Sequence, residues 1–211
     1  MKSIGVIYAT REGHTAKIAQ HVAAGLHSRG FVAVLSNLSD EREWMDFGSY
    51  DAVVIAASVH AGKHEPELIE FVKKHRVRLQ AMQAAFLSVT LSEAGAERQD
   101  ATPEEHARFQ ADVQTMIDSF IKETGWHPER VKPVAGALLY TKYNFLLRFI
   151  MKRISRKAGG DTDTSRDFDY TDWVDLDRFI DEFAERISQN APLALTEHRK
   201  IQVIDLKQRP S

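Results

Sequence analysis

The stretch Ile4-Gly5-Val6-Ile7-Tyr8-Ala9-Thr10-Arg11-Glu12-Gly13-His14-Thr15 decides the fold of this chain. Its first half is an unbroken apolar run bounded by a turn, which predicts a buried strand over residues 3–9. Its second half leads into a pattern in which Ile18, Val22 and Leu26 recur at helical spacing, so a helix is predicted over residues 14–29. The chain therefore begins with a strand, a polar turn and a helix.

The turn at residues 10–15 is a candidate phosphate site. It joins a strand to a helix N-terminus, where free backbone N–H groups, two Thr hydroxyls and the positive end of the helix dipole meet. Gly13 has no Cβ and lets a ligand approach the backbone, and Arg11 can add a charge-assisted contact. The spacing matches neither the dinucleotide nor the Walker motif, so a plain helix cap is the alternative interpretation.

Apolar runs and helical patterns alternate along the rest of the chain. Further strands are predicted over residues 31–35, 51–57, 84–89 and 131–139. Further helices are predicted over residues 64–80, from Thr102-Pro103-Glu104-Glu105 onward, and over residues 172–188. Five buried strands separated by helices predict an α/β fold with a doubly wound, five-stranded parallel sheet that is covered on both faces.

Three loops follow the carboxyl ends of predicted strands, the edge at which such sheets bind ligands. The first loop is the turn, with Thr10, Arg11, Glu12, Gly13, His14 and Thr15. The other two consist of Ser58, Val59, His60, Ala61 and Gly62, and of Thr90, Leu91 and Ser92 with the preceding Ser88 and Val89. Their convergence favours a phosphate at the first loop and a flat ring between the other two.

An insertion at about residues 140–170 separates the fifth strand from the last helix. Its first half, Tyr140–Ala158, has a helical pattern with one face formed by Tyr143, Leu146, Leu147, Ile150, Met151 and Ile154. We expect this face to pack on the body of the protein and to leave exposed Lys142, Phe145, Arg148, Phe149, Lys152, Arg153 and Arg156. A basic and aromatic surface of this kind predicts contact with anionic lipid or with an anionic, apolar substrate, and a plain solvated face is the alternative.

Composition and charge narrow the classes of protein. The chain has 211 residues, 43% of them hydrophobic and 27% charged, as in an ordinary soluble globular protein. It has no cysteine, so disulfides, thiolate metal sites and cysteine nucleophiles are excluded. The net charge of −2 hides an asymmetry, because residues 141–158 carry six basic and no acidic residues and the rest of the chain therefore sums to −8 (−2 minus +6).

We expect one domain over residues 1–190, with the insertion at about 140–170, followed by a C-terminal tail over residues 191–211. No apolar run approaches the roughly 20 residues that span a bilayer. A polar connection holds Trp44 and Phe47, and the tail contains the run Ile201–Ile204, which predicts either an edge strand or a loose segment.

The turn, the loop at 58–62 and the alternation of five strands with helices resemble the flavodoxin family. A closer resemblance is to the flavodoxin-like, quinone-dependent protoporphyrinogen IX dehydrogenases (oxidases) of bacteria. It covers about residues 2–188 and rests on Ala57-Ser58 with Gly62, Glu70–His75, Ser88-Val89, Ala135–Leu138, Gly159-Gly160 with Thr162–Thr164, and Tyr170–Trp173.

This resemblance implies the strand order 2-1-3-4-5 and a bound FMN, with the phosphate at the turn and the isoalloxazine between the loops at 58–62 and 88–92. It implies a peripheral enzyme of haem and porphyrin biosynthesis, on the cytoplasmic side of the cell membrane. The enzyme would oxidise protoporphyrinogen IX to protoporphyrin IX and pass six electrons to three molecules of menaquinone or ubiquinone. An anionic membrane surface is a further expected partner and a nucleic acid is not, and a homo-oligomer is left open.

Three other functions fit the same pattern of elements. A soluble flavodoxin-type electron carrier is one, although the cationic insertion counts against it. An FMN-dependent NAD(P)H:quinone reductase is the second, and a structural or signalling domain without flavin is the third. The chain departs from the family in its longer tail and in the segment 92–108, and loop 58–62 offers only His60 as a ring that could lie near a flavin.

Overall fold

The computed structural model describes residues 1–39 and 49–189. Its main sheet contains five parallel strands in the order β2-β1-β3-β5-β6. Their bounds are β1 Ser3–Ala9, β2 Val32–Asn37, β3 Ala52–His60, β5 Gln83–Thr90 and β6 Arg130–Ala135. Counted along the chain, these five strands have the expected order 2-1-3-4-5, so the predicted fold is confirmed. The connection with Trp44 and Phe47 and the run Ile201–Ile204 lie outside the described residues.

Strand β1 lies between β2 and β3 and supplies both faces of the core. Ile4 is opposite Ala33 on β2 and Ala52 on β3. The side chains of β1 alternate, so Ile4 and Val6 belong to one buried cluster while Ile7 and Ala9 belong to the other. This two-sided burial is the reason why the strand reads as a continuous apolar run rather than an alternating one.

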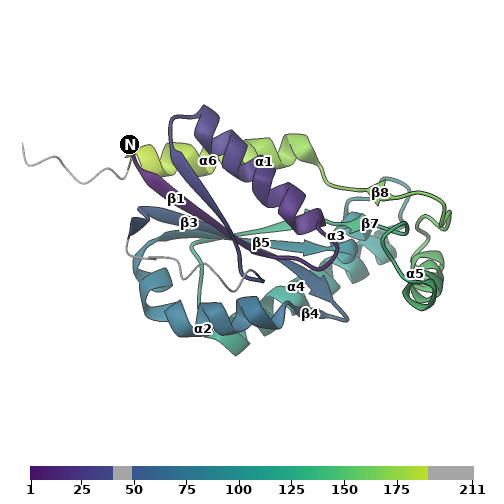
Figure 1. Ribbon diagram of the computed structural model, residues 1–211. Helices are drawn as coiled ribbons and strands as arrows, with labels where there is room; N and C mark the ends of the chain where they lie inside the picture. The colour runs from purple at the N-terminus through teal and green to yellow at the C-terminus, as the bar shows by residue number, and fades with distance from the viewer. Residues whose placement is uncertain (40–48, 190–211) are drawn as a thin grey trace, which may run out of the picture.

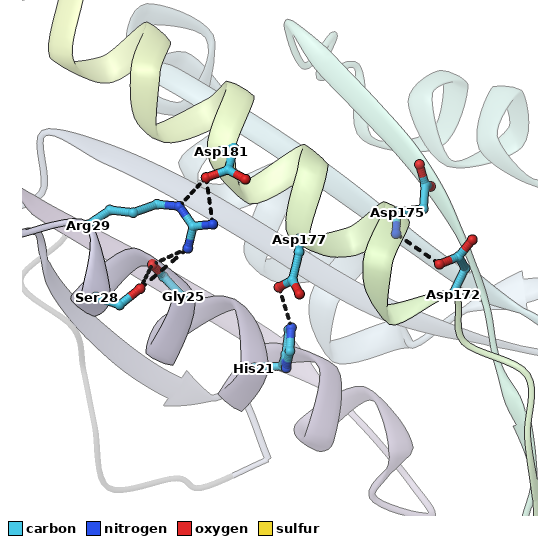
Figure 2. A network of polar contacts seen from close by, with 8 residues as sticks. All are labelled: His21, Gly25, Ser28, Arg29, Asp172, Asp175, Asp177 and Asp181. Atoms are coloured by element: carbon cyan, nitrogen blue, oxygen red, sulfur yellow. Dashed lines mark hydrogen bonds and ion pairs between the residues drawn. The ribbon is translucent and has the colours of Figure 1, made fainter.

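Helices cover the two faces in pairs (Figure 1). Helix α1 (His14–Ser28) and helix α6 (Trp173–Gln189) lie on one face, and α2 (Pro66–Ala81) and α4 (Pro103–Thr124) on the other. Ion pairs join α1 to α6: Arg29 lies 2.6 Å from Asp181, and His21 lies 2.7 Å from Asp177 (Figure 2). Helix α4 begins with the predicted cap, in which Thr102 and Glu105 each accept a hydrogen bond from the other's backbone N–H.

The connections at the carboxyl edge are more structured than the expected loops. Strand β3 continues to His60 and forms a tight hairpin with β4 (Lys63–His64), turned by Ala61 and Gly62 at φ of 49° and 79°. After β5, the hydroxyl of Thr90 caps a short helix, α3 (Leu91–Ala96), by accepting from the N–H of Ser92 at 3.0 Å. The predicted strand over 131–139 is interrupted at Gly136, and β7 (Ala137–Leu138) pairs with β8 (Phe168–Asp169).

The insertion contains one helix, α5 (Phe145–Lys157), which begins later than the helical pattern suggests. Asn144 sets its start, because its side chain accepts a hydrogen bond from the N–H of Leu147 at 2.9 Å. Figure 1 shows α5, β7 and β8 together beyond the carboxyl ends of the parallel strands. Among the residues that the structure describes, no helix combines the length and the apolar character needed to cross a bilayer.

Candidate functional site

The turn between β1 and α1 has the features of an anion site. Gly13 stands at the N-cap of α1 with φ of 95°, a left-handed conformation that favours glycine, and it gives the helix no side-chain cap. The Thr10 hydroxyl accepts from the N–H of Gly13 at 3.0 Å, so this side chain stabilises the turn itself. The Thr15 hydroxyl is only 1% exposed by residue and has no hydrogen-bond partner within the described part of the chain. A buried hydroxyl without a partner at a helix N-terminus fits a phosphate oxygen that would complete its hydrogen bonding.

A cation from the insertion lies beside this turn. The Lys142 ammonium donates a hydrogen bond to the carbonyl of Glu12 at 2.8 Å, and a Cβ on Gly13 would stand 3.4 Å from the same nitrogen. Lys142 is exposed as predicted, but its expected place on the helix is wrong, since the residue precedes α5 and bonds to a carbonyl 130 positions earlier in the sequence. Its charge adds to the positive end of α1 at the point where a phosphate would bind.

His14 contributes its side chain to the insertion rather than to the turn. Its Nε2 lies 2.8 Å from the Thr171 hydroxyl, which in turn donates to the carbonyl of Ala135 at 2.8 Å. Burial lowers the pKa of His14, and the carboxylate of Asp169 at 3.6 Å partly offsets that effect. The imidazole is thus a neutral bridge between the start of α1 and the segment after β8, and only the backbone N–H of His14 faces the anion site as a helix N-terminal group.

A buried carboxylate organises the hairpin at the end of β3. Glu65, 1% exposed, accepts from Arg11 Nε at 3.0 Å and from the Ser58 hydroxyl at 3.1 Å. Arg11, expected to contact the phosphate, is paired through Nε with this carboxylate. Glu65 precedes a proline at the start of α2, so its local sequence predicts only the start of a helix. Its partners Arg11 and Ser58 lie 54 and 7 positions earlier in the sequence, and no local pattern indicates these contacts.

His60 lies between two carboxylates of this cluster. Its Nε2 is 3.0 Å from Glu65 Oε1 and 3.4 Å from Glu12 Oε2, without a well-directed hydrogen bond to either. Half-buried on the β3 hairpin, the imidazole belongs to the same group of side chains as the phosphate turn. The second predicted loop is wrong for Ser58, Val59 and His60, which belong to β3, and Ala61 and Gly62 alone form the turn of the hairpin.

The third predicted segment is mostly strand. Ser88 and Val89 are buried at the end of β5, as the predicted strand over 84–89 requires, whereas Thr90 belongs to the same strand and not to a loop, and Leu91 is half-buried at the start of α3. The Ser88 hydroxyl lies 2.9 Å from His64 Nε2, and the His64 ring packs against Phe86 and Phe120 with centroids 5.2 and 5.0 Å apart. Burial lowers the pKa of His64 to about 4, so it is a neutral support for the hairpin beneath the site.

Helix α5 packs along a narrower edge than its sequence pattern predicts. Leu147 and Met151 contact the cluster of Leu138, Tyr140 and Tyr143, and Ser155 is buried one turn further on. The expected burial of Leu146, Ile150 and Ile154 is wrong, because they are 65%, 43% and 51% exposed. The cause is the surface that α5 packs against: the short antiparallel pair of β7 and β8 and short loops cover one stripe of the helix and no more.

Arg148 is also placed differently from the prediction. Its Nε donates to the carbonyl of Tyr140 at 2.9 Å and its Nη2 to that of Tyr143 at 3.1 Å, so its charge stabilises the turn before α5. The remaining surface of the helix carries apolar and basic groups together. We call this surface the α5 outer face; its members are Phe145, Leu146, Phe149, Ile150, Ile154, Arg153, Arg156 and the half-buried Lys152.

Comparison with known proteins assigns the architecture to a family. Residues 5–165 match the model of the flavodoxin domain. The protoporphyrinogen IX dehydrogenase [quinone] of Escherichia coli K12 is 36% identical over 186 residues, which cover 87% of this chain and 95% of that protein. The enzyme of the same name from Leishmania major is 30% identical over 201 residues, which cover 95% of this chain and 80% of that protein.

One solved structure extends the likeness to a larger protein. The flavodiiron core of Flv1 from Synechocystis sp. PCC6803 superposes with a TM-score of 0.52 at 11% identity. The match covers 90% of this chain and 37% of that one. At this identity the likeness concerns the fold alone.

Proposed function

Since the chain belongs to the flavodoxin-domain family and, within it, to the quinone-dependent protoporphyrinogen IX dehydrogenases, we propose that it oxidises protoporphyrinogen IX to protoporphyrin IX with FMN as cofactor. The observation that carries the proposal is the 36% identity over 95% of a relative that bears this name, insertion included. The reaction removes six hydrogens from the porphyrinogen. Three quinones accept them and become three quinols, so that protons and electrons balance.

The residues at the turn fit the cofactor that the family requires. The unpartnered Thr15 hydroxyl, the backbone N–H groups at the start of α1 and the Lys142 ammonium would hold the FMN phosphate. The β3 hairpin and the start of α3 would flank the ring. When bound, FMN supplies the two-electron chemistry, while the protein supplies binding, orientation and electrostatics.

The hairpin cluster supplies a group that can hold a proton. Glu65 fixes the positions of Arg11 and Ser58 and so determines where the hairpin stands relative to the turn. The imidazole of His60 lies with Nε2 3.0 Å from Glu65 and 3.4 Å from Glu12, which places a general acid–base side chain at this edge of the sheet. Oxidation of the porphyrinogen releases protons, and His60 is the acceptor that we assign to this edge of the sheet.

The α5 outer face supports a peripheral position at the membrane. Phe145 and Phe149 are 86% and 61% exposed on a helix that also presents Arg153 and Arg156 to solvent. Exposed aromatic rings beside cations suit the boundary between anionic headgroups and acyl chains. A location on the cytoplasmic side of the cell membrane, where the quinones menaquinone or ubiquinone are dissolved, follows as part of the same proposal.

Anaerobic turnover tests the activity. The FMN-loaded protein receives protoporphyrinogen IX and a water-soluble quinone analogue, and porphyrin fluorescence is followed beside an assay with NADH in place of the porphyrinogen. We expect porphyrin to form only with enzyme and quinone together. Quinone reduction by NADH with no consumption of porphyrinogen would instead assign the chain to the NAD(P)H:quinone reductases, and an inert flavoprotein would indicate an electron carrier.

A further inference from the structure

A cavity of about 370 Å³ lies between α3, α4, α5 and the segment after α5. Its walls are largely apolar and include Leu91, Phe109, Leu138, Met151 and Ile154. One side carries polar groups, among them Arg98, Asp161 and Tyr170. Neither the turn at 10–15 nor the β3 hairpin contributes to its lining, so the cavity is separate from the anion site described above.

Two of the lining residues connect the cavity with other parts of the proposed enzyme. Leu91 begins α3 at the carboxyl end of β5, the segment expected beside the flavin ring. Ile154 belongs to the α5 outer face and is 51% exposed, so it is at once a wall of the cavity and part of the exposed apolar surface. The cavity therefore joins the surface proposed to meet the lipid to the segment proposed to meet the cofactor.

The polar side of the cavity offers a hydrogen-bond donor to a carbonyl group. Arg98 is held in place by bonds from Nη1 to the carbonyl of Ala158 at 2.7 Å and from Nη2 to Glu105 at 3.3 Å. Its Nε is buried and lies 2.7 Å from Asp100, yet it has no well-directed acceptor among the residues described. The backbone is shaped around this side chain, since a Cβ on Gly159 would stand 2.6 Å from Nη1.

The size of the cavity favours one of the two substrates, the quinone, over the porphyrinogen. At about 370 Å³ the cavity lies near the small end of the range for ligand pockets, roughly 300–1,000 Å³, which suits a bicyclic quinone ring of about a dozen non-hydrogen atoms better than a porphyrinogen of about forty. The charges of its lining also favour the quinone. A porphyrinogen brings two carboxylates, and among the side chains that the structure describes the lining combines one cation, Arg98, with the carboxylates of Asp100 and Asp161.

We propose that this cavity binds the ring of the quinone that accepts the electrons, with the apolar walls around the ring and the Arg98 guanidinium next to a quinone carbonyl. The isoprenoid tail of a natural quinone would leave along Ile154 toward the α5 outer face. This inference rests on the proposed function, because it assigns a place to one of the two substrates of that reaction.

Filling the cavity tests the assignment. Ala94 lines it from α3, and Ala94→Leu adds bulk there, while Ala111→Leu makes the same change on the exposed surface of α4 as the matched control. Ile154→Trp narrows the cavity at a half-exposed position and keeps the test valid if Ala94→Leu does not fold. Binding of menadione to the FMN-loaded full chain is measured by titration calorimetry, and the bleaching of the flavin by protoporphyrinogen is followed without quinone.

We expect Ala94→Leu and Ile154→Trp to weaken menadione binding about tenfold or more, because overpacking displaces a ligand that fills the space, and Ala111→Leu to leave it unchanged. Flavin bleaching by the porphyrinogen should be the same in all four proteins. Equal menadione binding in the wild type and both cavity variants, or no binding by the wild type, would overturn the assignment. A wild type that binds menadione but is not bleached by the porphyrinogen would instead overturn the proposed function and leave the cavity assignment standing.

Discussion

Reversing the charges of the α5 outer face should release the protein from anionic membranes. The variant carries Lys152→Glu, Arg153→Glu and Arg156→Glu, and it leaves Arg148 unchanged because that side chain bonds two backbone carbonyls. Each basic residue near an anionic surface contributes about 1 kcal/mol. Loss of the three attractions therefore costs at least about 3 kcal/mol, or roughly a hundredfold in the partition coefficient, before any repulsion by the new carboxylates is counted.

Sedimentation with vesicles that contain phosphatidylglycerol measures this coefficient. The matched control is Lys74→Glu with Arg76→Glu and Arg78→Glu, the same change of charge on the exposed side of α2, which Figure 1 shows at a distance from α5. A separate variant, Phe145→Ser with Phe149→Ser, should lose about 2 kcal/mol per ring, and this loss should persist in high salt whereas the effect of the charges fades. The membrane proposal fails if the α5 charge variant sediments like the wild type, or if the α2 variant is released equally.

Three further changes test the site and the core. Thr15→Val should weaken FMN binding about tenfold in a titration of flavin fluorescence and leave the flavin-free protein at least as stable, because the buried hydroxyl has no partner among the described residues; unchanged affinity would contradict the phosphate assignment. Because the pKa of His64 is about 4 in the folded protein against 6.5 as its ordinary value, the unfolded chain binds more protons between these pH values. The free energy of unfolding should thus fall by up to about 3 kcal/mol as the pH drops from 6.5 to 4, and urea titrations of His64→Gln should lack that part of the fall. Gly5→Ala should cost about 1–3 kcal/mol of stability in urea, since its Cβ would stand 2.8 Å from the Tyr50 ring, and a cost near zero would show that the ring can move freely.

The strands and helices of the fold could be predicted from the sequence because each is marked by residues that are close together in the chain. The apolar run at Ile4–Ala9 needs only neighbours in sequence to read as a buried strand, and the cap at Thr102 needs only the next three residues. The hairpin after β3 and the short helix α3 escaped prediction for the opposite reason. Both are shorter than a periodicity can reveal, and β4 exists only because Val59 and His64 pair across a two-residue turn.

The chemistry of the candidate site depends on contacts that no local pattern contains. The positions in the turn could be named from residue types at a strand end, but the pairing of Arg11 with Glu65 and the return of Lys142 to the carbonyl of Glu12 join distant parts of the chain. The error on α5 has the same origin. A helical pattern ranks the faces by their residues, whereas the surface that the helix packs against decides how wide a stripe is covered. The short pair of β7 and β8 covers only the line through Leu147, Met151 and Ser155.

Besides carrying the α5 outer face, the insertion contacts the part of the chain that would hold the FMN phosphate. The insertion and the adjoining Thr171 contact the cofactor turn and the first turn of α1 at three points, through Lys142 at Glu12, through Thr171 at His14 and through Asp169 at Lys17. Any displacement of β7, β8 and α5 by a lipid surface therefore acts on the first turn of α1, where the phosphate would be held. If such a displacement changes the affinity for FMN, then bound FMN changes the affinity for vesicles by the same factor and in the same direction. An FMN affinity that is identical with and without vesicles would mean that membrane binding does not displace the insertion. The membrane would then determine where the enzyme works without altering its cofactor site.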